Sequence, residues 1–276
     1  MSIVDQDWFK ILHPGVIADL GAVRHVLLDF DGTISVLRQG WEPVMQAMML
    51  DAICPGKTPP PDLVTEVHDY IDRSTGILTI LQMQWLAAKV HDYGIKPQPL
   101  TASAYKKRYL EELMLSVSNR LEALESGTVP AETYLMRGAG EFVAGLAEKG
   151  ITLYIASGSD HIDVLHEAHA LGISAFFEDR IYGALDESET NGKERVIQRI
   201  LDDHHLAGKE LLVVGDGPVE IIEATQRGAL SLGVASDEVK RSGWNQHKIA
   251  RLTRAGSDFL VADFAQSAEL ITAFVS

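Results

Sequence analysis

Cysteine is nearly absent from this chain, since Cys54 is the single one among 276 residues. One thiol excludes an intramolecular disulfide, which fits a reducing compartment. Nothing around Cys54 has the pattern of a cysteine protease, so we interpret it as a buried or loop-edge residue without a chemical role. The chain must therefore fold on its apolar core, and its length is sufficient for a large one.

Long apolar runs are also missing. No stretch approaches the roughly 20 apolar residues that a membrane-spanning helix needs. The first residues, Met1 to Asp7, have neither the basic start nor the apolar run of a signal peptide. We therefore expect a soluble, cytoplasmic protein with no membrane partner.

Positive charge is scarce, with 24 Lys and Arg against 39 Asp and Glu and a net charge of −15. This balance argues against a surface that binds nucleic acid. A phosphorylated ligand, itself anionic, would need a local positive site made of a metal ion, a lysine and backbone amides. The motifs described below offer candidates for all three.

The apolar pattern predicts an α/β fold. Short apolar runs predict buried strands, and helical patterns that end near glycine follow between the later ones. This alternation indicates a Rossmann-like, doubly wound parallel sheet with helices on both faces. The predicted strands are residues 25–28, 151–156, 211–214, 229–235 and 259–261, and the predicted helices between them are residues 137–149, 160–171, 191–203 and 218–227.

The interval between the first two predicted strands breaks the alternation. It is predicted to be helical at residues 41–53, 61–74, 77–93 and 102–125, with Pro and Gly clustered between the helices. We predict a helical domain, residues 36–130, inserted into a core domain formed by residues 1–35 and 131–276. The residues before the first strand have no assigned role, and an extra helix packed across the core is one interpretation.

Two acidic residues follow the first predicted strand, in Asp29-Phe30-Asp31-Gly32-Thr33. On an extended segment, side chains two residues apart point the same way, and two close carboxylates need a bridging cation or proton. Gly32 permits a sharp turn after them. Asp and Gly are also common turn formers after strands, so this motif alone leaves both readings open.

Ser157-Gly158-Ser159 follows the second predicted strand. A hydroxyl and backbone amides at the start of a helix can bind phosphate. The alternative, which local evidence favours, is that Ser157 or Ser159 merely caps the next helix.

Lys193 is predicted to lie in the first turn of a helix, after Asn191, which resembles a capping box with Glu194. A cation there opposes the helix dipole, which makes a functional task for Lys193 more plausible. Local evidence still favours the alternative, a solvated lysine on the surface.

Asp216 and Glu220, four residues apart, follow the strand at residues 211–214. Carboxylate oxygens of this kind suit Mg²⁺, although Gly215-Asp216-Gly217 can also form a simple turn.

In this order, the four clusters resemble the motifs of the haloacid dehalogenase-like hydrolase superfamily. The closest resemblance is to its phosphatase branch with an inserted helical cap, which includes phosphoglycolate phosphatase and β-phosphoglucomutase. It covers the chain from about His25 to the end. Glu220 departs from the pattern, because members usually have Asp there.

The resemblance implies a Mg²⁺-dependent hydrolase of a small phosphate monoester. Asp29 would attack phosphorus and become an aspartyl phosphate, and Asp31 would act as general acid and base. Ser157, a backbone amide near Gly158 and Lys193 would bind the phosphoryl group. Mg²⁺ would be held by Asp29, the backbone carbonyl of Asp31 and Asp216, and Glu220 would steady the metal's waters or Lys193.

The inserted helices would then form a cap that closes over the site. Residues 34–40 and 129–136 would be its hinges. Arg38, Arg73, Lys106 and Lys107 are cationic candidates for substrate contacts, although each is read as a solvated surface residue. The substrate stays open among sugar phosphates, phosphoglycolate and nucleotides, and the oligomeric state between monomer and homodimer.

Three alternatives remain at this stage. A phosphomutase would return the phosphoryl group to its substrate. A phosphonate hydrolase would need a cap lysine for a Schiff base, with Lys57, Lys89, Lys106 and Lys107 as candidates. A non-catalytic regulatory module is disfavoured, because all four motif positions carry chemically competent residues.

Overall fold

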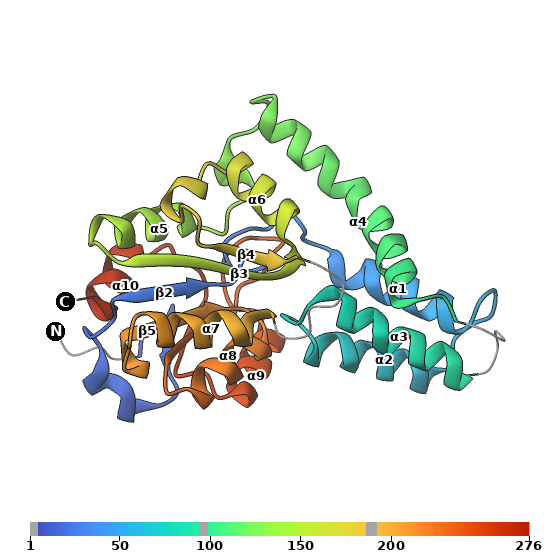
Figure 1. Cartoon of the computed structure of the whole chain (residues 1–276), viewed down its shortest axis with the longest axis horizontal. Helices are drawn as coiled ribbons and strands as arrows, with labels where there is room; N and C mark the ends of the chain where they lie inside the picture. Colours follow the sequence, from blue (N-terminus) through green and yellow to red (C-terminus); the bar gives the residue numbers. More distant parts are fainter. Residues whose placement is uncertain (1–4, 94–98, 186–191, 276) are drawn as a thin grey trace.

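A seven-stranded sheet forms the centre of the larger part of the molecule. The structure, a computed structural model, describes residues 5–93, 99–185 and 192–275 (Figure 1). The strand order is β1-β7-β6-β5-β2-β3-β4, with β1 antiparallel to β7 and all other neighbours parallel. The strands are β1 Phe9–Ile11, β2 His25–Leu28, β3 Thr152–Asp160, β4 Ile181–Ala184, β5 Leu211–Gly215, β6 Leu230–Val234 and β7 Phe259–Val261.

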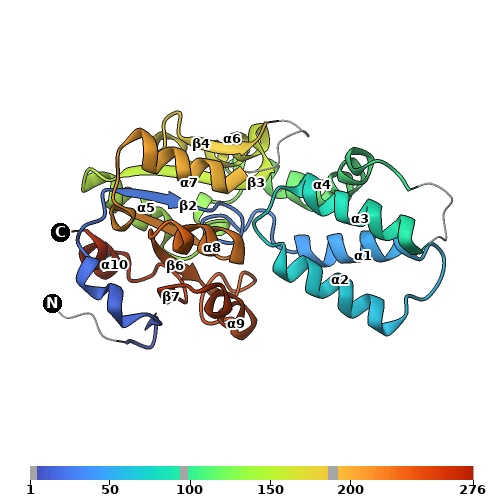
Figure 2. The ribbon, with the colours of Figure 1, turned by 60° about the horizontal axis from the view of Figure 1, so that its bottom comes forward.

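Helices cover both faces of this sheet, which confirms the predicted α/β, Rossmann-like core (Figure 2). The central strand β2 shows why: Val26 and Leu28 pack into the apolar cluster on one face, and Leu27 into that on the other. A strand buried on both faces needs a continuous apolar run, which β2 has. One face carries α5 Ala139–Glu148, α6 His161–Ala170 and α10 Ser267–Phe274, and the other carries α7 Gly192–Asp203, α8 Pro218–Gln226 and α9 Gln246–Ala255.

The two edge strands differ from the sequence-based expectation. The segment before β2 had no assigned role, and an extra helix across the core was one interpretation of it. It instead adds the short strand β1 to one edge, followed by a 3₁₀ helix at Pro14–Asp19. Strand β4, between α6 and α7, was not predicted. Both are three or four residues long and only partly buried, so neither has the apolar run by which a strand is recognised.

Strand β3 also runs further than predicted, through Ser157 to Asp160, and α6 begins at His161. The interpretation of Ser157 or Ser159 as a helix cap is therefore wrong, because both lie before the N-cap residue Asp160. The capping box expected at Asn191 lies outside the described residues.

Four helices pack together beside the carboxyl ends of the strands (Figures 1 and 2). Helix α1 contacts the other three, and its Met45, Met48 and Met49 are buried in their shared core. Cys54, at the end of α1, is buried as a free thiol. Within the described residues, no helix combines the length and apolarity required to span a bilayer. The helices are α1 Trp41–Ile53, α2 Pro61–Arg73, α3 Thr79–Tyr93 and α4 Ala102–Glu125.

Candidate active site

The loop after β2 is shaped by its own backbone and by Gly32. The amide of Asp29 donates to Val214 O of β5 at 2.8 Å, and Phe30 O accepts from the amides of Ile34 and Ser35. Gly32 has a φ of 78°, and a Cβ on it would lie 2.6 Å from Asp216 Oδ2. Only glycine therefore lets this loop turn so close to the carboxylate that ends β5.

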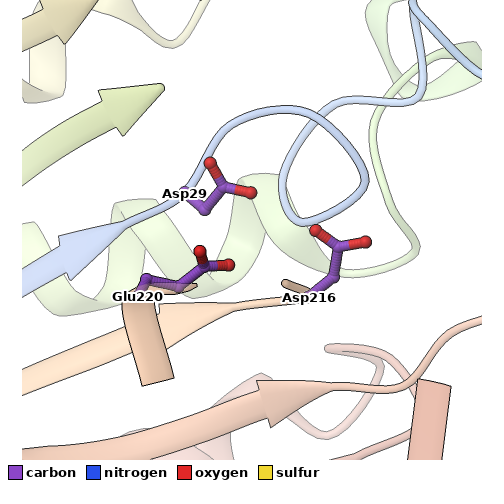
Figure 3. A group of neighbouring side chains, drawn as sticks. All are labelled: Asp29, Asp216 and Glu220. Atoms are coloured by element: carbon purple, nitrogen blue, oxygen red, sulfur yellow. The ribbon is translucent and has the colours of Figure 1, made fainter. Parts of the chain in front are cut away.

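Three buried carboxylates converge beside this loop (Figure 3). Asp29 follows β2, Asp216 follows β5, and Glu220 lies in the first turn of α8. One oxygen from each of Asp29, Asp216 and Glu220 lies within 4.8 Å of the other two. Lys193 enters the same group from α7, with Nζ 2.7 Å from Asp29 Oδ1 and 2.9 Å from Glu220 Oε2. The parallel sheet thus brings together four residues that the sequence singled out separately.

The electrostatics of Asp29 indicate a shortage of positive charge. Burial raises the pKa of Asp29 well above its ordinary value, Lys193 opposes this rise, and Glu220 and Asp216 add to it. An all-oxygen donor set of carboxylates is the kind that binds hard divalent cations. The residues present therefore fit a divalent metal.

Glu220 has both oxygens engaged. Its Oε1 accepts from the amide of Gly217 at 2.8 Å, and its Oε2 accepts from Lys193 at 2.9 Å. The additional methylene of Glu, compared with the Asp that is usual in the family the motifs resemble, lets one side chain span both groups. This geometry favours Glu220 as a support for Lys193 and for the loop that carries Asp216.

Asp216 has cationic neighbours that the sequence reasoning missed. Lys248 Nζ lies 2.6 Å from Asp216 Oδ2 and 2.6 Å from Glu238 Oε1, and Arg251 Nη2 donates to Asp216 O at 2.9 Å. Burial alone would raise the pKa of Asp216, but Lys248 and Arg251 outweigh it and lower that pKa. The sequence held a signal for these neighbours, because Lys248 and Arg251 are three residues apart and therefore share one face of α9.

Asp31 is held by serine hydroxyls from β3. Ser157 Oγ and Ser159 Oγ donate to its Oδ2 at 3.2 and 2.9 Å. Its Oδ1 is buried without a hydrogen-bond partner among the described residues, and the nearest cation is Arg38, with Nε at 3.7 Å. The structure therefore brings Ser157 to Asp31 and adds Ser159, which was not among the expected site residues.

Arg38 is not the solvated surface residue that the sequence suggested. It is 5% exposed, and its Nε and Nη2 both donate to Glu167 Oε1, at 2.9 and 2.6 Å. Burial raises the pKa of Glu167 to about 7, although Arg38 opposes that rise. Glu167 lies on α6, outside every motif, and nothing in the sequence pointed to it.

The four-helix layer reaches the site through the turn between α2 and α3. A Cβ on Gly76, whose φ is 97°, would lie 2.5 Å from Glu220 Oε2, and one on Gly158 would lie 2.3 Å from Ile77 O. Glycine at both positions thus permits close contact between the two parts of the chain. Between them is a cavity of about 70 Å³, lined among others by Asp29, Asp31, Arg38, Trp41, Met45, Gln82, Tyr109, Ser157, Gly158 and Asp216.

The other cationic candidates lie elsewhere. Arg73 is exposed and stacks over Tyr70, and Lys107 is exposed beside Glu111. Lys106 pairs with Asp160. No lysine of the described residues lines the 70 Å³ cavity, so the Schiff-base alternative gains no support.

Comparison with known proteins agrees with this geometry. A family model described as haloacid dehalogenase-like hydrolase matches residues 23–227. The chain belongs to the haloacid dehalogenase-like hydrolase family. The resemblance stated from the motifs is confirmed, and so is the prediction that the chain is an enzyme of the hydrolase class.

One curated relative matches part of this hydrolase. It is a 5'-nucleotidase of Pseudomonas aeruginosa, 30% identical over 104 residues, which are 37% of this chain and 46% of the relative. The hydrolase therefore aligns with slightly less than half the length of that relative.

Solved structures share the fold over nearly the whole chain. A predicted phosphoglycolate phosphatase from Haemophilus somnus has a TM-score of 0.59 at 16% identity, covering 90% of this chain and 98% of its own. A β-phosphoglucomutase from Clostridium difficile has a TM-score of 0.58 at 15% identity, covering 91% and 99%. At such identities the likeness establishes the fold alone, and the fold is the expected one.

Proposed function

We propose that this hydrolase removes the phosphoryl group from a small phosphate monoester, with Mg²⁺ as cofactor and an aspartyl phosphate on Asp29 as intermediate. The observation that carries the proposal is the position of Asp29. Asp29 is buried directly after β2, where it lines the cavity and contacts Lys193. One of its oxygens lies within 4.8 Å of an oxygen of Asp216, so a single metal ion could bind both.

The reaction proceeds in two displacements. Asp29 Oδ forms a bond to phosphorus while the bond from phosphorus to the alcohol oxygen breaks, and Asp31 gives that oxygen a proton. Asp31 then takes a proton from water, whose oxygen attacks the aspartyl phosphate and releases inorganic phosphate and Asp29. The hydrogen bonds from Ser157 and Ser159 support this role by holding the Asp31 carboxyl at the cavity wall.

Lys193, Ser157 and the amide near Gly158 bind the phosphoryl oxygens in this proposal. Mg²⁺ would be held by a carboxylate oxygen of Asp29, the backbone carbonyl of Asp31 and Asp216, and it would neutralise phosphoryl charge when bound. Glu220 keeps Lys193 in place. Positioning and charge neutralisation of this kind provide most of the catalysis in phosphoryl transfer.

We further propose that residues 36–130 form the cap domain and residues 1–35 and 131–276 the core domain. The packing of α1 against α2, α3 and α4 supports this division. Helix α4 also contacts α6, and Gly76 approaches Glu220, so the cap meets the core at the site. A cytoplasmic location and a small phosphorylated metabolite as partner complete the proposal.

The experiment is phosphate release from a panel of monoesters in the presence of Mg²⁺. We expect release that stops with EDTA, returns with added Mg²⁺ and is lost in Asp29→Asn. Asp69→Asn, an exposed cap residue, is the matched control and should keep full activity. Full activity in Asp29→Asn would exclude the mechanism, and isomerisation of a hexose phosphate without phosphate release would identify a phosphomutase instead.

A further inference from the structure

Arg38 is fixed by acids on one side of its guanidinium group. Nε and Nη2 donate to Glu167 Oε1, and Nη2 also donates to Asp163 Oδ2 at 3.2 Å. Its Nη1 makes no hydrogen bond to any described residue, and Arg38 lines the cavity. A buried guanidinium held by two groups and free at the third is already arranged to bind a ligand oxygen.

The charge around Arg38 limits what that oxygen can belong to. Asp31, Asp163 and Glu167 all lie within 3.7 Å of the guanidinium, so three acids face one cation. Even with Glu167 partly protonated, the acids balance or exceed the positive charge. A carboxylate at Nη1 would add one more negative charge to this group, whereas a hydroxyl or carbonyl oxygen would not.

The size of the cavity sets a second limit. About 70 Å³ is well below the roughly 300–1,000 Å³ of pockets that enclose drug-sized ligands. It is several times the roughly 10–15 Å³ that a cavity needs to hold one water, so it has room for a small group and not for a large one. The phosphoryl group and the proposed metal ion must share this space, so we expect only a short alcohol to fit beside them.

Apart from Arg38, the cap side of the cavity is uncharged: it combines apolar side chains with the neutral polar groups of Thr75, Thr79 and Gln82. Trp41 and Met45 come from α1 and Tyr109 from α4, and Met45 and Tyr109 are buried in the core of the cap. An uncharged wall of this kind accepts carbon atoms and hydroxyl groups, and it offers no partner for a second charged group.

We infer that the substrate is a phosphate monoester of a short, uncharged alcohol that carries a hydroxyl or carbonyl oxygen, and that Arg38 Nη1 binds this oxygen. The inference rests on the proposed function and narrows its substrate. A carboxylate-bearing ester and a nucleotide are both excluded, the first by charge and the second by size.

The first test compares kcat/KM for three esters. Glycerol 3-phosphate and 3-phosphoglycerate both have three carbons and differ in the carboxylate, whereas uridine 5'-monophosphate differs in size. We expect glycerol 3-phosphate to exceed each of the others by at least ~10-fold. Asp29-dependent hydrolysis that favours 3-phosphoglycerate or uridine 5'-monophosphate would overturn the inference and leave the proposed function intact. No Asp29-dependent hydrolysis of any ester would remove both.

The second test isolates Arg38. Arg38→Lys keeps the charge but loses the planar group, so kcat/KM for glycerol 3-phosphate should fall by ~10-fold or more. Ethyl phosphate, which has no second oxygen on its alcohol, should be affected much less, and Arg73→Lys is the matched control. An equal loss for both esters would mean that Arg38 acts only through Asp31 and would overturn the contact.

Met45→Ala gives an independent measurement if Arg38→Lys does not fold. It enlarges the cavity on its cap side, so activity on uridine 5'-monophosphate should rise relative to glycerol 3-phosphate. An unchanged ratio would contradict the limit set by size.

Discussion

The two walls of the cavity differ in almost every physical respect. The core wall presents Asp29, Asp31 and Asp216, which are fixed at strand ends and paired with cations from other elements. Apart from Arg38, the cap wall presents neutral side chains such as Trp41 and Met45, whose positions depend on the packing of helices against one another.

This difference separates two tasks. Backbone hydrogen bonds and buried ion pairs hold the core wall, which suits groups that must meet a phosphoryl centre with little freedom. Helix packing can change the shape of the cap wall without disturbing those groups. We therefore expect substitutions in the core wall to remove activity, and substitutions in the cap wall to alter the stability of the protein or its choice of substrate.

The largest effect is expected for Lys193→Met. It leaves Asp29 and Glu220 buried without their shared cation, which should cost ~3–5 kcal/mol of unfolding free energy. Phosphate release should fall by at least ~100-fold, because a positive group at the phosphoryl site is lost. Chemical denaturation and steady-state kinetics measure the two effects.

Lys209→Met is the control, since Lys209 pairs with Asp19 on the surface. Near-normal activity in Lys193→Met would contradict the assigned role of the core wall.

Leu86→Ala tests the packing behind the cap wall. Leu86 is fully buried in α3, so the cavity left by truncation should lower the unfolding free energy by ~2–5 kcal/mol. Leu115→Ala, at an exposed position of α4, should change it by less than ~0.5 kcal/mol. Because Leu86 lies behind the cap wall, Leu86→Ala should be less stable but keep a kcat near that of the parent enzyme. A loss of kcat as large as that in Lys193→Met would contradict the separate tasks of the two walls.

Arg251→Lys probes the connection between the walls. Arg251 Nη1 donates to Asp72 Oδ1 and Thr75 Oγ1 of the cap, at 3.0 and 3.2 Å, while Nη2 donates to Asp216 O. Lysine cannot make these contacts at once, so we expect kcat/KM to fall by about 5–10-fold. Arg254→Lys, at an exposed neighbour, should behave as the parent enzyme.

His25 should produce the smallest effect, because it lies at the opposite end of β2 from Asp29. Burial and the nearby His204 lower the pKa of His25 to about 4, below its ordinary 6.5. The unfolded state therefore binds this proton more readily than the folded state. As a result, His25 does not lower the free energy of unfolding above about pH 6.5, but lowers it progressively as the pH falls from 6.5 towards 4.

His25→Gln should flatten that decline in pH-dependent denaturation and leave kcat unchanged. His91→Gln, an exposed histidine of α3, should keep the slope of the parent protein. A change in kcat for His25→Gln would show that this end of the sheet communicates with the core wall.

Local patterns in the sequence predicted most of the regular structure. The helices α1 and α4 and the strands β2 and β7 begin and end at the predicted residues, because their apolar periodicity and flanking Gly, Pro and Thr are local signals. The edge strands β1 and β4 were missed, since their pairing partners, rather than their own residues, make them strands.

The same division holds for the site. Asp29, Asp31, Lys193 and Asp216 were recognisable because each lies at the end of an element whose type the sequence already indicated, and parallel strands bring such ends together. Arg38, Glu167, Lys248 and Arg251 became site neighbours only through tertiary contacts that join distant segments.

A local pattern can therefore determine which groups stand at the carboxyl edge of the sheet, because backbone geometry and apolar periodicity act over a few residues. The pairing of Arg38 with Glu167, and the small volume left beneath Trp41 and Tyr109, arise from long-range packing and from the cost of burying unpaired charge. The ion pair and the cavity volume exist only in the folded chain, and the inferred choice of substrate rests on both.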